Sequence, residues 1–403
     1  MFLRCILICL ITLASLPTAH ADLELQGNLE VQLRLFTQDA LLITQHDNNL
    51  SVALEPEFFY SWNDGDDSFE FVPFARLDQR DDERTHVDIR ELSWVHVADN
   101  WESRIGIRKE FWGVTEFQHL VDIINQTDSV EDIDGEDKLG QPMVNLSLVR
   151  DWGIIDLYVL PYFRERTFSG SNGRPAFAQL NQDAALYEHQ RGDEHIDYSA
   201  RWSHSIGNFD LGFSVFKGTS RDPEFVPVFT NPSSPQPDQI VPFYRQITQY
   251  SLDLQATMGD FLWKLEAVNN DNTLEDYSAI QFGFEYSRYG VFNSNADLGW
   301  LTEYAWDSRG TDSLSTNVSS NQNDLYLGSR LAFNDVNSNE VLAGIAYDFD
   351  FNSVSFLVEA SRRVGNNIKV SVDVRLFNSD QPSDPLFFFR RDDHIQLTAQ
   401  YYY

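Results

Sequence analysis

Apolar and polar residues alternate along long stretches of this chain. Between Ile368 and Leu376 every even position is apolar, and the positions between them carry Lys, Ser, Asp or Arg. The same alternation runs from His394 to the final residue, Tyr403. Because successive side chains of a β-strand point to opposite faces, a period of two predicts strands with one apolar and one polar face.

Segments of this kind recur along the whole chain and are separated by turn residues. We predict an all-β protein with about 18 strands, within a range of about 16 to 18, because sequence places strand boundaries only to within a few residues. The predicted strands lie near 23–35, 50–62, 68–78, 85–98, 101–110, 142–150, 153–164, 195–206, 208–218, 241–256, 261–269, 277–288, 296–306, 324–333, 340–348, 353–363, 367–377 and 393–403. No internal repeat or linker divides them, so we expect one barrel domain over 22–403.

Most connections between the predicted strands are of two kinds, and a third group of intermediate length, at 64–67, 270–276, 289–295, 334–339 and 349–352, fits neither. Tight turns rich in Gly, Asn and Asp lie at 98–100, 150–152, 206–208, 258–260 and 365–367. Long polar connections lie at 111–141, 165–194, 219–240, 307–323 and 378–392. Short turns at one end and long loops at the other are typical of a transmembrane antiparallel β-barrel with short periplasmic turns and long extracellular loops. A soluble β-sandwich would show the same strand pattern, with its polar faces toward water.

The N-terminus has the pattern of a secretory signal peptide. A basic start precedes an apolar segment over 5–16, and a small-residue cleavage site ends at Ala21. We therefore expect residues 1–21 to be removed. Cys5 and Cys9 lie within this segment, so the mature chain would have neither a disulfide nor a cysteine-based metal site. The signal peptide and the terminal aromatic residue favour the membrane barrel over the soluble sandwich.

The last strand resembles a known signal. Apolar residues occupy every second position before Tyr403, and the chain ends on three tyrosines. This ending resembles the C-terminal signal of bacterial outer-membrane proteins, in which a terminal aromatic residue follows apolar residues at alternate positions. The resemblance implies a Gram-negative outer-membrane location and contact with outer-membrane lipid. It also implies that the barrel-assembly machinery recognises the strand ending at Tyr403.

A second resemblance lies within 101–166, which is about one sixth of the chain. A strand carrying Arg104 and Arg108 leads into a Trp-Gly pair at Trp112, and an acidic loop and two further strands follow. This arrangement resembles a group of proteobacterial outer-membrane porins. The resemblance implies passive diffusion of small hydrophilic solutes and, by analogy with porins, a homotrimer. It names no solute and supplies no catalytic residue.

Charge narrows the classes of function. The formal net charge is −33, which argues against nucleic acid as a partner, because phosphates require a basic surface. The polar strand faces carry both signs of charge with acids in excess, so a hydrated pore would mildly prefer cations or zwitterions. The pore-lining candidates are Glu102, Arg104, Arg108, Asp156, Arg164, Lys369, Asp373 and Arg375. The alternative is that these charges pair across strands and only stabilise the wall.

The acidic connection at 111–141 is a candidate constriction loop. Its acidic residues are Asp122, Asp128, Glu131, Asp132, Asp134, Glu136 and Asp137. Folded inward, the loop would face Arg104, Arg108 and Arg164. Opposed charges across a narrow point would create a transverse field that selects solutes by charge and dipole. The alternative is a solvated outer loop.

Other chemistry has less support in the sequence. The segment 132–135 is similar to part of an EF-hand loop, but Val130 and Gln141 stand where the first and last calcium ligands would be. Calcium is thus a third option for the loop, and we predict no metal site. The histidines are scattered and none lies in a G-x-S-x-G motif, so we predict no catalytic residues and no cofactor. We predict a porin, with a non-conducting barrel that binds a partner or surface polymer, or a barrel-embedded hydrolase, as alternatives.

Overall fold

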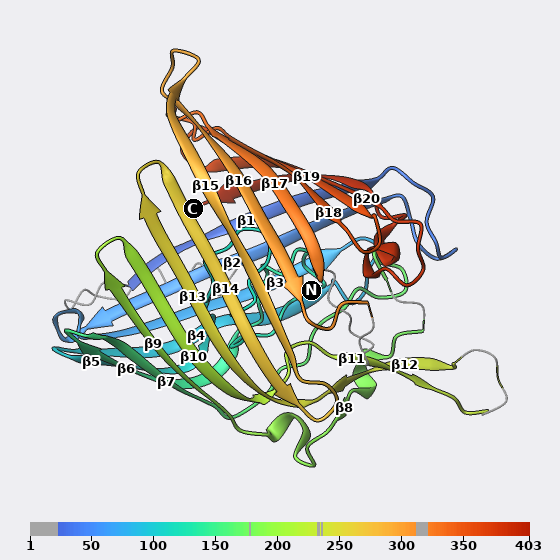
Figure 1. The fold of residues 1–403 in the computed structure, drawn as a ribbon, viewed down its shortest axis with the longest axis horizontal. Coiled ribbons are helices and arrows are strands. Elements are labelled where there is room, and N and C mark those ends of the chain that lie inside the picture. The colour runs from blue at the N-terminus through green and yellow to red at the C-terminus, as the bar shows by residue number, and fades with distance from the viewer. Residues whose placement is uncertain (1–22, 177–178, 232–233, 235–236, 312–320) are drawn as a thin grey trace, which may run out of the picture.

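The chain forms a closed antiparallel β-barrel of 18 strands, which confirms the predicted fold class (Figure 1). Strand β1 pairs with both β2 and β21, and this pairing closes the sheet. The computed structural model describes residues 23–176, 179–231, 234, 237–311 and 321–403. The signal peptide expected over 1–21 lies outside the described residues.

Each strand of the barrel pairs with the barrel strand that follows it in the chain. The barrel strands are β1 (Leu23–Phe36), β2 (Asn48–Trp62), β3 (Asp67–Asp78), β4 (His86–Ala98), β5 (Trp101–Arg108), β6 (Gln141–Arg150), β7 (Gly153–Leu160), β9 (Asp197–Ile206), β10 (Phe209–Thr219), β13 (Gln246–Met258), β14 (Phe261–Asn272), β15 (Tyr277–Val291), β16 (Ala296–Asp307), β17 (Asn323–Ala332), β18 (Glu340–Asp348), β19 (Val354–Val364), β20 (Ile368–Asn378) and β21 (His394–Tyr402). The remaining elements are β8 (Leu186–Tyr187), β11 (Glu224–Val228), β12 (Gln239–Tyr244), and the short 3-10 helices η2 (Asn63–Gly65), η3 (Gln182–Ala184), η4 (Gly192–Glu194) and η5 (Pro385–Phe389).

The two ends of the barrel differ in their connections. Tight turns join the strands at one end, on the left in Figure 1, and include 99–100, 151–152, 207–208, 259–260 and 365–367. We call this the tight-turn end; β1 begins and β21 ends there. The opposite, long-loop end carries the connections between β5 and β6, β7 and β9, and β10 and β13. Because neighbouring strands are antiparallel, successive connections alternate between the two ends. The long-loop end also carries two short connections, at 273–276 and 349–353.

Strand alternation separates an apolar outside from a polar inside. On β21, Leu397 is 41% exposed, whereas its neighbours Gln396 and Thr398 are 6% and 8% exposed. The apolar side chains point away from the barrel, and the polar side chains pack inside it, because adjacent residues of a strand face opposite ways. The hydrated face of these strands is therefore the interior of the barrel.

Two of the predicted loops contain a small additional sheet. Strands β8, β11 and β12 form it, and Figure 1 shows β11 and β12 projecting beyond the long-loop end. The single strand predicted over 241–256 is therefore wrong, since its first part belongs to β12 and its remainder to β13. The break lies at Arg245, whose guanidinium pairs with Glu224 of β11. Backbone pairing with β11 and β8 holds β12 in the small sheet, and this ion pair adds a side-chain contact to it.

Two local features end strands near the long-loop end. Strand β7 ends at Leu160, earlier than predicted, because Pro161 has no backbone N–H to donate to a neighbouring strand. After β20, Asp384 caps helix η5 by accepting a hydrogen bond from the Leu386 N–H at 2.8 Å.

Among the described residues, no helix is long and apolar enough to cross a membrane.

Candidate functional site

The connection between β5 and β6, residues 109–140, lies inside the barrel, and we call it the inward loop. Its residues Val121 and Ile124 are completely buried. They belong to one apolar cluster with Phe216 of β10 and Val268 of β14. Burial of apolar side chains against the wall stabilises the loop inside the barrel. A solvated outer loop, considered from the sequence, is not what the structure shows.

A buried glutamate of β14 holds the first part of the inward loop. Glu266 accepts hydrogen bonds from the backbone N–H groups of Val114 at 2.6 Å and Thr115 at 3.0 Å, and from the Thr115 hydroxyl at 2.7 Å. Its second oxygen accepts from the Val121 N–H at 3.2 Å. A carboxylate without solvent contact requires such donors to remain charged. Glu266 therefore anchors the loop to the wall.

A second glutamate, Glu303 of β16, holds the next two residues. The backbone N–H groups of Glu116 and Phe117 donate to it at 2.8 and 3.2 Å. The side chain of Glu116 in turn pairs with Lys264 at 3.5 Å and with Arg330. Strand alternation places both Glu266 and Glu303 on polar faces that line the lumen, but it predicts no anchoring role for them, and it does not select Glu116.

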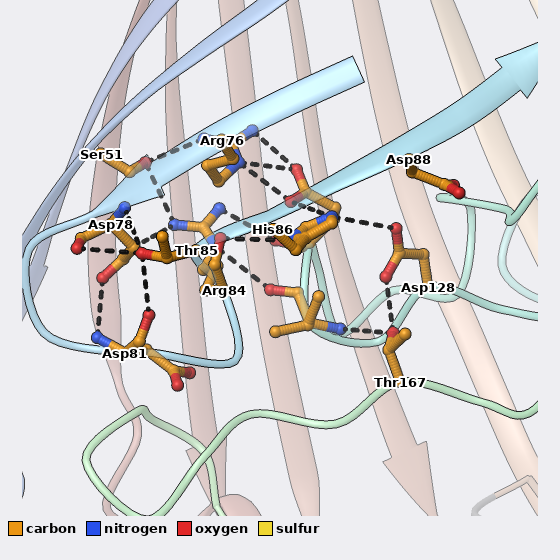
Figure 2. A network of polar contacts seen from close by, with 12 residues as sticks. Ser51, Arg76, Asp78, Asp81, Arg84, Thr85, His86, Asp88, Asp128 and Thr167 are labelled. Atoms are coloured by element: carbon orange, nitrogen blue, oxygen red, sulfur yellow. Dashed lines mark hydrogen bonds and ion pairs between the residues drawn. The ribbon is translucent and has the colours of Figure 1, made fainter. Parts of the chain in front are cut away.

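Basic residues near β3 and β4 hold the other side of the inward loop (Figure 2). The guanidinium of Arg76 donates to both oxygens of Glu131 at 2.9 Å, and Arg90 donates to Asp128 at 2.6 Å. Arg84, in the connection between β3 and β4, donates to two backbone carbonyl oxygens of the loop at 3.0 and 3.2 Å. Charge-assisted bonds of this kind are stronger than neutral ones, so the loop is fixed across the interior from both sides.

Further along the loop, two acids pair with other strands. Asp132 lies 3.7 Å from Arg34 of β1, and Asp134 lies 3.2 Å from Arg375 of β20. Arg375 also contacts Glu359 of β19 at 3.0 Å. The acidic part of the loop therefore faces the wall formed by β1, β3, β4 and β20.

The loop acids do not face the three arginines expected from the sequence. Arg104 and Arg108 lie on β5, at the base of the loop, and both contact Glu110, at 3.6 and 2.8 Å. Arg164 pairs with Asp88 of β4 at 2.8 Å. The expected pairing is therefore wrong, because the acidic segment of the loop pairs instead with Arg34 of β1, Arg76 of β3 and Arg90 of β4.

The other pore-lining candidates lie in two places. Glu102 pairs with its neighbour on the same strand, Arg104. Asp156 of β7 accepts a hydrogen bond from a serine of β6. Lys369, Asp373 and Arg375 line a cavity between β20 and the inward loop. Only this last group lies close to the acidic segment of the loop.

The remaining candidate residues of the inward loop contact other residues of the same loop. Asp122 pairs with Lys138 at 3.1 Å, and Glu136 lies 3.7 Å from His119. Asp137 accepts a backbone hydrogen bond within the loop and lines the cavity. His119 was not selected from the sequence, because its contacts with acids depend entirely on the folded path of the loop.

Two polar cavities lie on either side of the inward loop. The larger, of about 490 Å³, lies between the loop and the inner faces of β1–β4 and β18–β21. The second, of about 370 Å³, lies between the loop and β13–β16. Both are lined by Phe117, Asp134, Glu136 and Lys138, which we call the neck. Ten carboxylates and six basic side chains line the larger cavity, so its wall has an excess of negative charge.

Several groups of the loop titrate near neutral pH. Burial and the neighbouring Asp132 raise the pKa of Asp134 to about 7. Enclosure inside the barrel, with further acids nearby, raises the pKa of Asp137 to about 7. Burial alone would lower the pKa of His119, but contacts with two glutamates raise it to about 9. At neutral pH the loop therefore carries an imidazolium cation and two carboxyl groups close to half ionisation.

Potential metal ligands do not cluster in the part of the chain that the structure describes. No three Asp, Glu, His or Cys side chains there, including those of 132–135, are placed to hold a metal ion. His195 contacts Asp197 at 2.8 Å, and the ring of His394 bonds to a backbone carbonyl. None of the hydrogen bonds made by described histidines goes to a serine hydroxyl.

Comparison with known proteins adds distant structural likenesses. A scan against protein-family models found no match, and a search of the curated proteins found none either. A mutant of the Rh. blastica porin is 11% identical over 95% of this chain and 100% of its own, with a TM-score of 0.44. OmpT, an outer membrane protein of Vibrio cholerae folded in vitro and in trimer form, is 9% identical over 96% of this chain and 100% of its own, with a TM-score of 0.44. Likeness at this distance supports no conclusion about solute or assembly.

Proposed function

We propose that this chain is an outer-membrane channel for passive diffusion of small hydrophilic solutes, with a mild preference for cations and zwitterions. The observation that carries the proposal is the pair of polar cavities on the two sides of the inward loop, which share the residues of the neck. A wall with ten carboxylates against six basic groups raises the local concentration of cations. Asp134 and Glu136, with Lys138 nearby, would orient dipolar solutes as they pass.

The outer surface supports a place in a lipid bilayer. Apolar side chains of the strands, such as Leu397, are exposed on the outside of the barrel. Exposed tryptophans flank them, with Trp101 and Trp263 at the tight-turn end and Trp306 at the long-loop end. An apolar band between aromatic residues suits the hydrocarbon layer and its two interfaces.

The assembly that accompanies this function is part of the proposal. The mature protein would be the single barrel domain 22–403, released from the signal peptide 1–21. Its tight turns would lie in the periplasm and its long loops outside the cell. The strand ending at Tyr403 would be recognised by the barrel-assembly machinery, and a homotrimer is proposed by analogy with porins.

One alternative has a specific observation in its favour. The inward loop is held by Glu266 and Glu303 on one side and by Arg76 and Arg90 on the other. A segment fixed so firmly across the interior would also suit a non-conducting barrel that binds a partner through its outer loops. Only a measurement of ion flow separates this alternative from the channel.

The test is single-channel conductance of the refolded mature chain in a planar lipid bilayer. We expect stable current steps and, in a salt gradient, a reversal potential of the sign given by cation preference. Stable insertion without current steps would overturn the channel and leave the non-conducting barrel. Steps with anion preference would retain the channel but remove the larger cavity from the conducting pathway.

A further inference from the structure

A third cavity, of about 240 Å³, lies between the inward loop and the inner faces of β17–β20. We propose that this cavity binds small organic cations, namely protonated alkylamines with a short apolar chain. The inference rests on the proposed channel and names a solute class for it. Two residues of the neck, Phe117 and Asp134, also line this cavity. An amine bound here would therefore lie at the entrance to the neck.

Two carboxylates of the cavity face each other without a cation. Asp324 of β17 and Asp348 of β18 are direct partners in the register of the two strands. Both are buried, each with 4% of its surface exposed. Neither forms an ion pair with any residue that the structure describes. Like charges directly opposite on adjacent strands repel, and burial strengthens the repulsion, so either a proton held by the pair or a bound cation would relieve it.

A buried amide beside these carboxylates also lacks a partner. Gln322 is 1% exposed, and its Nε2 donates to Asp348 at 2.9 Å. Its Oε1 accepts no hydrogen bond. A buried carbonyl oxygen without a donor is unfavourable, and the N–H groups of an ammonium ion are donors that carry the needed charge. Because Gln322 is bonded to Asp348, a cation bound at that carboxylate would also lie near this oxygen.

Basic side chains of the protein do not neutralise the carboxylates. Among the described residues lining the cavity, Arg375 is the basic one. Its guanidinium is already shared between Asp134 at 3.2 Å and Glu359 at 3.0 Å. Asp348 accepts hydrogen bonds from the backbone N–H groups of Asp350 and Phe351, and Asp324 accepts one from the N–H of Asn323. These donors are neutral, so the counter-charge would come from a cationic ligand.

Four aromatic rings form part of the wall. Phe117 of the inward loop stacks on Tyr326 of β17, with ring centroids 4.9 Å apart. Phe377 of β20 packs against Phe389 of η5, with centroids 5.4 Å apart. Aromatic faces attract organic cations and also cover their alkyl groups. The volume lies below the about 300–1,000 Å³ of pockets for drug-sized ligands, which fits a short alkylamine.

Binding is tested by isothermal titration calorimetry of the refolded barrel in detergent micelles. The probe is butylammonium chloride, with butanol as the uncharged control and sodium chloride as the inorganic one. We expect saturable binding of butylammonium alone. Asp324→Asn should weaken it about tenfold, because it removes a buried counter-charge. Asp373→Asn, which removes a carboxylate of the larger cavity, should change it less than about twofold.

A second variant protects the test against misfolding. Asp324→Asn should fold, since it removes repulsion between facing carboxylates, and the circular dichroism spectrum checks this. Phe389→Leu keeps apolar volume but removes a ring, and should weaken butylammonium binding about threefold. Binding unchanged in both variants, or equal heat from sodium, would overturn the inference.

The failure of the site and the failure of the channel give different results. Current steps in the bilayer without butylammonium binding would overturn the amine site and leave the channel intact. Butylammonium binding without current steps would overturn the channel and leave the site as a binding pocket of a closed barrel.

Discussion

Glu266 shows how a single side chain of the wall controls a segment that is distant in sequence. Its carboxylate accepts four hydrogen bonds from Val114, Thr115 and Val121. In Glu266→Gln the negative charge is lost and a donor replaces one acceptor oxygen. We expect the docking of the inward loop to weaken by about 2 kcal/mol, within the range for hydrogen bonds to charged groups. Hydrogen–deuterium exchange of those three backbone amides should become faster.

The control for this prediction is Glu285→Gln. Glu285 lies on β15, the strand next to Glu266, and forms no hydrogen bond or ion pair among the described residues. The same chemical change there should leave the exchange of the loop amides unchanged. Equal acceleration in both variants would mean that net charge, and not the hydrogen bonds of Glu266, holds the loop.

Residue roles were harder to predict than residue positions. Alternation places Glu266 and Arg76 on polar strand faces, and the structure finds both inside the barrel. Their roles depend on partners such as Val114, which lies 152 residues from Glu266 in the chain, and no local pattern encodes such a contact. One signal in the sequence does indicate an inward path. Val121 and Ile124 are apolar residues in an otherwise polar loop, and in the structure both are buried.

Strands were predicted well because their signal is local. A period of two is visible within one segment, and it predicted which residues of β20 and β21 face the interior and which face outward. The failure at 241–256 has the same origin. Two apolar segments adjoin there, and only their pairing with different strands, β12 with β11 and β13 with β10, assigns them to different sheets.

The two faces of a strand should respond differently to the same substitution. Leu397 of β21 faces outward, whereas Ser371 of β20 lines the larger cavity. Leu397→Arg should lower the free energy of unfolding in lipid vesicles by about 2–4 kcal/mol, the range for arginine near the middle of a bilayer. Ser371→Arg should cost less, because water and carboxylates surround the new charge. Equal losses in a denaturant titration would argue against lipid at the outer face.

At the scale of the whole molecule, the charge of the lumen should depend on pH. The pKa values of Asp134 and Asp137 are both raised to about 7, by enclosure and by neighbouring acids. A carboxyl group is ionised above its pKa, so both are mostly charged at about pH 8 and mostly neutral at about pH 6. His119, with its pKa raised to about 9, stays cationic at both. Acidification therefore removes up to two negative charges from the conducting pathway.

Cation preference should consequently fall on acidification, by about twofold between about pH 8 and pH 6. Reversal potentials in a salt gradient measure this directly. The double variant Asp134→Asn with Asp137→Asn should already show the weaker preference at pH 8 and should respond less to pH than the wild type. Asp151→Asn, in a tight turn outside the lumen, should keep the response. If wild-type selectivity is the same at both pH values, ions do not pass these two carboxylates, and other acids of the larger cavity, such as Asp373, must set the preference.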